Sequence, residues 1–237
     1  MVISEDIKEK YAPLSETKNK STYHVIKRVF DIVLSLAACI VFLLPMCTIA
    51  LAIMVVDKGN PFFVQTRVGL NGEEFRIVKL RSMKKGAECI MESLSREQLT
   101  KYRSEYKLDD DPRLLGWKKP GDGTRCFGAR LRRSSMDELP QIFFNILLTG
   151  HMSVVGPRPV LKDELYEHYT PDEREILLSV KPGLTGYWQA TARNNASYST
   201  GLRQEMELDY AQNENFLWDV RIVFQTFGAI LKKQGAK

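Results

Sequence analysis

The sequence predicts a mainly helical α+β protein: an N-terminal membrane helix, then a globular domain with a short β-hairpin and interfacial helices. Residues 32–56 form a run of 25 residues without a single charge. Beyond this run, two short strand-like segments precede a series of segments with helical character. These observations divide the chain into a polar tail over 1–21, a membrane segment over 22–60 and a globular domain over 61–237.

The charge-free run is long enough for a membrane helix. A helix of this length measures roughly 37 Å, against a hydrocarbon core of ~30 Å. The run begins too late and is too long for a cleavable signal peptide, which leaves a helix buried in a soluble core as the alternative. Pro45 lies near the middle of the run. Because proline removes a backbone donor and crowds the preceding turn, we expect a kink there.

The charges that flank this helix favour a helix that returns to the side it entered. Lys27 and Arg28 precede the run, and residues 61–135 contain 17 Lys and Arg against 10 Asp and Glu. Positively charged flanks favour the cytoplasmic side of a membrane, and here both flanks are positive. A re-entrant helix broken at Pro45 satisfies this rule at both ends. A kinked helix that spans the bilayer is the competing topology.

The basic middle region also predicts an anionic partner: phosphate groups, nucleic acid or an acidic membrane surface. Nucleic-acid binding would require aromatic residues interleaved with the basic ones, and residues 61–135 hold few, so we expect no nucleic acid. The four cysteines contain no CxxC pair. This argues against a zinc site or a disulfide framework and favours a reducing compartment.

The globular domain is expected to begin with a β-hairpin. Residues 62–67 and 74–80 have strand character and flank a turn at 69–72. Helices are predicted at 87–107, 136–148, 163–179, 201–213 and 216–232, with a loop rich in glycine, proline and charge at 109–128. The last helix has an apolar stripe that includes Leu217, Phe224 and Phe227, which is typical of either a core face or a membrane-surface face.

The segment from Ser135 to Pro140 has two interpretations. Ser135 and Glu138 fit the S-x-x-E capping box of a helix N-terminus, with no chemistry implied. Alternatively, the unpaired amides and positive dipole end of that helix would bind phosphate and keep Asp137 ionised. An ionised aspartate can attack a phosphoryl group, and Glu138 could hold a Mg²⁺ ion that neutralises the approaching anions.

Basic and polar side chains are available to bind phosphate oxygens. A planar guanidinium can grip phosphate through two parallel hydrogen bonds. Each candidate alone could be an ordinary surface residue, and the group as a whole is stronger evidence for phosphate binding. The candidates are Gln65 and Arg67 on the first predicted strand, Lys79 and Arg81 at the end of the second, Arg132 and Arg133 before the acidic pair, and Arg158 between two prolines.

Together these motifs resemble the small monotopic phosphoglycosyl transferases, the bacterial sugar transferase family that starts capsule, exopolysaccharide and O-antigen assembly. The resemblance covers nearly everything from Lys27 to the C-terminus, and such an ordered set is far more specific than any single motif. The stretches that carry it are Lys27–Asp31, Asn60–Gly69, Phe75–Met83, Asp111–Arg113, Leu131–Gln141, Met152–Pro159 and Lys181–Gln189, with Asp209, Tyr210 and Asp219 towards the end.

The resemblance implies an enzyme that transfers a phosphosugar from a UDP-sugar to polyprenyl phosphate, undecaprenyl phosphate in bacteria, and releases UMP. Asp137 would be the nucleophile, and Asp137 and Glu138 would lie at a Mg²⁺ site. The helix would be re-entrant, with the catalytic domain on the cytoplasmic face of the inner membrane. The positions that would bind substrate or phosphate are Gln65, Arg67, Lys79, Arg81, Arg132, Arg133, Arg158, Gln189 and Arg193. The identity of the sugar and the oligomeric state, a homodimer included, stay open.

Some positions depart from the family pattern. Residues Trp117–Arg125 look inserted in a loop that is longer than usual, and His151 replaces a common aspartate. Thr191-Ala192-Arg193 replaces a commoner Ser-Gly-Arg, and Met136 replaces a leucine. The first two bear on loop and sugar details and leave the acidic pair intact. A non-catalytic scaffold of the polysaccharide machinery is the main alternative function, and it would tolerate the loss of the Asp137 carboxylate.

Overall fold

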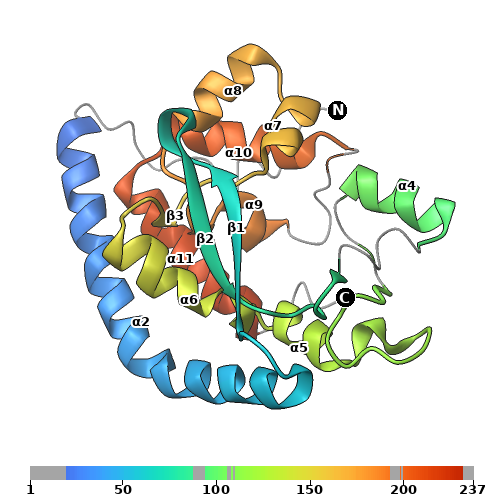
Figure 1. Ribbon diagram of the computed structural model, residues 1–237. Helices are drawn as coiled ribbons and strands as arrows, with labels where there is room; N and C mark the ends of the chain where they lie inside the picture. Colours follow the sequence, from blue (N-terminus) through green and yellow to red (C-terminus); the bar gives the residue numbers. More distant parts are fainter. Residues whose placement is uncertain are drawn as a thin grey trace.

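The computed structural model describes residues 20–87, 94–105, 108, 110–192, 198 and 200–231. One long helix, α2 (Lys20–Asp57), borders a domain built from short helices and two small sheets (Figure 1). The prediction of a mainly helical α+β fold is therefore confirmed for these residues. The predicted polar tail, except for its last two residues, lies outside them.

Within the described residues, α2 is the one helix long and apolar enough to cross a membrane, and Pro45 lies inside it. The helix continues through the proline, so the break expected there is a bend. Figure 1 shows that the two ends of α2 run in different directions around the domain. Many of its apolar side chains are exposed, Ile40 by 83% and Leu44 by 77%. Such a surface is expected of a helix in contact with lipid.

Both ends of α2 are fastened to the same domain. Near the N-terminus, Lys27 forms a buried ion pair with Asp219 at 2.7 Å. Near the C-terminus, Ile53 is fully buried in a core cluster of the domain, and Asp57 pairs with Arg81 at 2.5 Å. A straight helix of 38 residues would be roughly 57 Å long. The bend is therefore what allows both ends to reach one domain.

The predicted hairpin is confirmed. Strand β1 (Phe62–Val68) pairs antiparallel with β2 (Glu74–Leu80), and the turn between them contains the 3₁₀ helix η1 (Leu70–Gly72). Phe75 and Ile77 lie on one face of β2 and pack against Ile146 and Met152. The hairpin is therefore held against the helical segment that follows the acidic pair.

That helical segment is irregular. It comprises the 3₁₀ helix η3 (Met136–Glu138), one short α-helix, α6 (Leu139–Gln141), and the π-helix η4 (Ile142–Leu148). The helix predicted over 136–148 exists, although little of it is α-helical. Asn145, buried in η4, uses its side chain to bind β2: Oδ1 accepts from the Val78 amide at 3.1 Å, and Nδ2 donates to the Arg76 carbonyl at 2.7 Å. The asparagine thereby joins η4 to the strand that carries Lys79.

The other predicted helices are present with changed bounds. The remaining elements are α4 (Arg96–Glu105), η2 (Asp122–Thr124), α5 (Phe127–Arg133), β3 (Ser153–Val155), α7 (Lys162–His168), α8 (Pro171–Leu178), β4 (Gly183–Thr185), α9 (Tyr187–Thr191), α10 (Leu202–Asn213) and α11 (Phe216–Leu231). The helix predicted over 163–179 is divided in two, because Tyr169 is extended and Thr170 caps a second helix that has Pro171 in its first turn.

A second, parallel sheet was not predicted. Strand β3 pairs with β4, with Ser153 opposite Gly183 and Val155 opposite Thr185. The two chains approach so closely that a Cβ on Gly183 would lie 2.1 Å from the Gly156 nitrogen, so this position requires glycine. The close pairing places the loop after β3 beside the segment that leads from β4 into α9.

The main core lies where α9, α10 and α11 meet β3, and Tyr210 and Trp218 are buried at its centre. The apolar stripe predicted on the last helix does not belong to this core throughout. Leu217, Phe224 and Phe227 are exposed, whereas Trp218 turns inward from the same helix. Of the two interpretations of the stripe, the described residues therefore favour a surface face.

Candidate active site

Asp137 and Glu138 lie in η3, directly after a residue with a left-handed backbone. Ser135 has φ 55°, and its side chain makes no capping hydrogen bond. The capping-box interpretation is therefore wrong, because a capping residue needs an extended backbone to turn its hydroxyl towards the following amides. The left-handed backbone of Ser135 turns the chain between α5 and η3. Asp137, two residues later in η3, is only 7% exposed.

The pKa of Asp137 is raised to about 6. Burial is the largest cause and the negative charge of Glu138 adds to it, whereas Lys79 and Arg132 act in the opposite direction. An aspartate in this environment is still mostly ionised at neutral pH, and its carboxylate is more basic than usual. Both properties suit a nucleophile.

Two basic residues are held close to the acidic pair. Lys79, on β2, places its Nζ 2.6 Å from Glu138 Oε1. Arg132, on α5, donates from its Nε to Ser82 Oγ at 3.0 Å. The hairpin and α5 thus each bring a positive charge to η3.

A cavity that is partly open to solvent lies beside Glu138. Its wall combines the hairpin, the acidic segment, the loop after β3 and the start of the β4–α9 segment. The residues that line it are Arg67, Ile77, Lys79, Glu138, Gln141, Arg158, Pro159, Gly183, Leu184 and Gln189. Because these include three cationic side chains and a single carboxylate, the lining is net positive.

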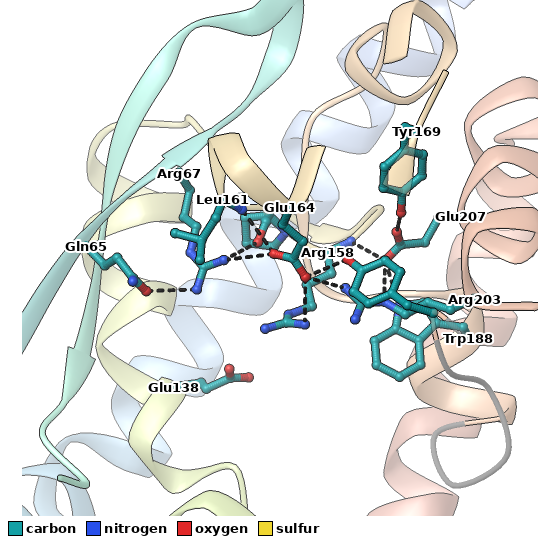
Figure 2. A network of polar contacts seen from close by, with 12 residues as sticks. Gln65, Arg67, Glu138, Arg158, Leu161, Glu164, Tyr169, Trp188, Arg203 and Glu207 are labelled. Carbon is teal, nitrogen blue, oxygen red and sulfur yellow. Dashed lines mark hydrogen bonds and ion pairs between the residues drawn. The ribbon is translucent and has the colours of Figure 1, made fainter. Parts of the chain in front are cut away.

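The two arginines of the cavity belong to a buried polar network (Figure 2). Arg67 donates to Glu164 at 3.3 Å and to Gln65 at 2.8 Å, and Arg158 lies 3.6 Å from the same Glu164 carboxylate. Burial and the positive charge of Arg158 lower the pKa of Arg67 to about 10. Gln65, Arg67 and Arg158, which were predicted separately, therefore come together in the folded chain.

Other predicted site residues have different positions. Arg81 pairs with Asp57 at the end of α2 and is not among the residues that line the cavity. Arg133 is exposed at the end of α5. Arg193 lies outside the residues that the structure describes. Gln189 lines the cavity, and its buried Oε1 has no hydrogen-bond partner within the described part of the chain.

Asp110 organises the loop that contains Trp117–Arg125. Its carboxylate accepts hydrogen bonds from Trp117 Nε1 at 2.7 Å and from the amides of Gly121 at 2.6 Å and Gly123 at 2.8 Å. His151 is exposed, and its ring centroid lies 5.6 Å from that of Phe75. Neither the segment Trp117–Arg125 nor His151 is among the residues that line the cavity.

Glu164, Arg203 and Glu207 were not among the predicted site residues. All three are buried, and Glu207 accepts hydrogen bonds from Tyr169 and Trp188. The available signal was weak: Arg203 and Glu207 are spaced i, i+4 on the helix face that also carries the core residue Tyr210. A charged pair on an otherwise apolar helix face is expected to take part in a buried network of hydrogen bonds and ion pairs.

Asp137 and Glu138 are also the candidate magnesium ligands. In the described residues, no group of three or more His, Cys, Asp and Glu side chains could hold a metal ion. Mg²⁺ often needs only one or two carboxylates, because substrate phosphates and water complete its octahedron. Asp137 and Glu138 are adjacent, and the charge of Glu138 raises the pKa of Asp137. Two such carboxylates fit a Mg²⁺ site whose other ligands are substrate phosphates and water.

Known proteins resemble the chain over most of its length. A family model described as bacterial sugar transferase matches residues 22–233. The chain is 36% identical over 226 residues to the "UDP-galactose-lipid carrier transferase" of Erwinia amylovora, which covers 94% of the chain and 44% of that protein. It is 36% identical over 219 residues to the "Exopolysaccharide production protein ExoY" of Sinorhizobium fredii, covering 90% of the chain and 88% of the relative.

A third relative is the "UDP-glucose:undecaprenyl-phosphate glucose-1-phosphate transferase" of Escherichia coli, 33% identical over 219 residues, or 90% of the chain and 42% of that protein. The chain therefore spans less than half the length of the Erwinia and Escherichia proteins and most of the length of the Sinorhizobium protein.

Proposed function

The chain belongs to the bacterial sugar transferase family, and on that premise we propose that it transfers a sugar 1-phosphate from a UDP-sugar to polyprenyl phosphate and releases UMP. Undecaprenyl phosphate is the expected carrier, and the product would start an exopolysaccharide, capsule or O-antigen chain. The observation that carries the proposal is a buried carboxylate, Asp137, whose chain neighbour Glu138 lines a cavity with a net positive lining. This combination suits a nucleophile that attacks a diphosphate.

In the first step, a carboxylate oxygen of Asp137 attacks the β-phosphorus of the UDP-sugar. The new bond from oxygen to phosphorus forms as the bond between the β-phosphorus and the bridging oxygen breaks, and UMP leaves with that electron pair. Arg67 and Arg158 would bind the non-reacting phosphate oxygens, since guanidinium groups match their geometry. Lys79 would add positive charge beside the nucleophile.

In the second step, a phosphate oxygen of polyprenyl phosphate attacks the same phosphorus. The bond from Asp137 to phosphorus breaks, the carboxylate is restored, and polyprenyl diphospho-sugar is the product. UMP leaves before the lipid reacts, so the kinetics would be ping-pong.

Asp137 and Glu138 would hold Mg²⁺ together with the phosphate oxygens of the donor. The ion would supply the charge neutralisation that an anionic nucleophile needs when it approaches an anionic diphosphate. The raised pKa of Asp137 supports this assignment, because the charge repulsion that contributes to it would be relieved by a cation.

The proposal places the domain on the cytoplasmic face of the inner membrane, with α2 as a re-entrant helix. Two ion pairs, Lys27 with Asp219 and Asp57 with Arg81, bind opposite ends of α2 to one domain. A spanning helix would separate its ends by ~30 Å of hydrocarbon. The exposed apolar stripe of α11 would contact the same membrane surface.

UMP release by the detergent-solubilised protein tests the proposed reaction. The assay contains Mg²⁺ and UDP-glucose, UDP-galactose or UDP-N-acetylgalactosamine, each with and without undecaprenyl phosphate; relatives are named for these three sugars. We expect many turnovers with one donor, and only when the lipid is present. No release from any donor by folded protein would favour the non-catalytic scaffold.

A further inference from the structure

We propose that Glu164 is a positioning residue that holds Arg67 and Arg158 in the cavity wall for the diphosphate of the nucleotide donor. The inference rests on the proposed function and deepens it. Glu164 comes from α7 and is not among the residues that line the cavity. It therefore acts through the two arginines that do.

One carboxylate contacts guanidinium groups from three separate segments. Glu164 is 1% exposed, and its Oε2 accepts from Arg67 Nη1 at 3.3 Å. Its Oε1 lies 3.6 Å from Arg158 Nη1 and accepts from Arg203 Nη2 at 3.4 Å. Figure 2 shows the carboxylate between Arg67 and the pair formed by Arg158 and Arg203. Without it, like charges from β1, the loop after β3 and α10 would repel one another.

Two groups other than the arginines also hold Glu164 in place. The Leu161 amide donates to Oε2 at 3.1 Å, and the Tyr198 hydroxyl donates to Oε1 at 2.5 Å. Burial alone would raise the pKa of Glu164, but the charges of Arg158 and Arg203 and these hydrogen bonds lower it to about 2. The carboxylate is thus permanently charged and fixed in direction, as a positioning group must be.

The third arginine closes the network behind the cavity. The guanidinium carbon of Arg203 lies 4.0 Å from the ring centroid of Tyr198 and 4.7 Å from that of Trp188. Arg203 also pairs with Glu207 at 3.7 Å. Arg203 is therefore committed to the protein interior. Arg67 and Arg158 remain at the cavity wall, where a diphosphate can meet them.

Removing the charge of Glu164 distinguishes two effects that it could have on UDP binding, the positioning of the arginines and the repulsion of an anion. Glu164→Gln makes the surroundings of the cavity more positive by one charge, and on electrostatic grounds alone an anion would bind more tightly. If Glu164 positions the arginines, its loss lets them move apart and binding becomes weaker. The two roles therefore predict changes of opposite sign.

The test measures UDP binding by isothermal titration calorimetry with the full-length protein in detergent and EDTA, so that only side chains contribute. We expect Glu164→Gln to raise the Kd for UDP about tenfold, on the order of the loss of one hydrogen bond to a charged group. The KM for the UDP-sugar should rise by a similar factor, with a much smaller change in kcat. Tyr198→Phe, which removes one donor to Glu164, should raise the Kd in the same direction by a smaller factor.

Asp111→Asn is the matched control. Asp111 is a buried carboxylate whose arginine partner among the described residues is Arg113, at 2.7 Å, and it is not among the residues that line the cavity. It should lower the melting temperature as Glu164→Gln does and leave the Kd for UDP unchanged. An equal loss of UDP binding in Asp111→Asn would mean that general destabilisation, and not positioning, explains the effect.

Unchanged or tighter UDP binding by folded Glu164→Gln would overturn the inference. If that variant does not fold, Glu164→Asp and Tyr198→Phe decide: both keep a buried charge, both should weaken UDP binding, and wild-type affinity in both would overturn the proposal. If the wild-type protein binds UDP only when Mg²⁺ is present, the same comparison of variants is made with Mg²⁺. Failure of the wild-type protein to bind UDP with Mg²⁺ present is a different result, since it would contradict the proposed function itself.

Discussion

Lys79 Nζ lies 2.6 Å from Glu138 Oε1, and this contact joins the hairpin to the acidic pair. Lys79 lies on β2, and the side chain of Asn145 in η4 forms two hydrogen bonds to that strand. The π-helix η4 begins only a few residues after Glu138. The positive charge of Lys79 also opposes the rise in the pKa of Asp137. The lysine therefore contributes both to the shape of the site and to the ionisation of its nucleophile.

Activity should fall below about pH 6. Burial and Glu138 raise the pKa of Asp137 to about 6, and only the ionised form can attack phosphorus. Each pH unit below that value should lower kcat/KM for the donor about tenfold. The measurement is a profile of kcat/KM from pH 4.5 to 8. An acidic limb near pH 4, the ordinary range of an aspartate, would contradict the raised pKa of Asp137.

Lys79→Met should move this acidic limb to higher pH. Lys79 favours the charged form of Asp137, so its removal raises the pKa further. Lys162→Met is the control, because Lys162 is exposed and pairs with Glu74 away from the cavity. The control should keep the wild-type limb. A shift of equal size in both variants would indicate a general effect of net charge.

Asp137→Asn should abolish turnover and stabilise the fold. A carboxyl whose pKa is raised in the folded state costs stability as pH rises from the unfolded pKa, 3.8, to the folded value, about 6, and the cost is constant above that. A shift of roughly 2 units corresponds to about 3 kcal/mol at pH 7. Denaturant unfolding in EDTA should show a gain of up to this size at pH 7 and almost none at pH 3.5. Equal stability at both pH values would contradict the assigned environment.

Asn145→Leu should destabilise the protein by about 2–4 kcal/mol, because it removes two hydrogen bonds and leaves the Val78 amide and Arg76 carbonyl of β2 without these partners. Turnover should fall as well, since Lys79 lies on the same strand. The readouts are denaturant unfolding and kcat. Asn213→Leu, at an exposed position on α10, is the control and should change the unfolding free energy by less than about 1 kcal/mol.

The topology of α2 can be tested with single cysteines at Lys20 and Lys58 in a cysteine-free background. A re-entrant helix places both positions on the cytoplasmic face, so a membrane-impermeant maleimide should label both in inverted vesicles and neither in intact spheroplasts. Labelling of one position from each side would establish a spanning helix instead.

Local patterns predicted the parts of the fold that depend on local physics. The charge-free run predicted α2, and strand-like segments on either side of a glycine-containing turn predicted the hairpin. The parallel pairing of β3 with β4 could not be predicted, because three-residue strands have no usable period and their contact depends on two glycines far apart in sequence. The left-handed Ser135 was also missed, since S-x-x-E is the signature of an extended cap.

For the candidate site, single residue types in motifs identified Asp137, Glu138, Lys79, Arg67 and Arg158. Only the folded structure shows that Glu138, Lys79, Arg67 and Arg158 line one cavity. Glu164 illustrates the limit: Asp163 and Glu167 are acidic residues on the same short helix, and only tertiary packing buries one carboxylate against three arginines.

The most direct test of the proposed chemistry is the mass of the protein after incubation with Mg²⁺ and the preferred UDP-sugar in the absence of lipid. A covalent intermediate predicts one equivalent of UMP released in a burst and a mass increase of one phosphosugar, located by peptide mapping on Asp137 and lost when polyprenyl phosphate is added. Rapid turnover with lipid but no burst and no adduct without it would contradict a nucleophilic Asp137 and indicate direct transfer from donor to lipid.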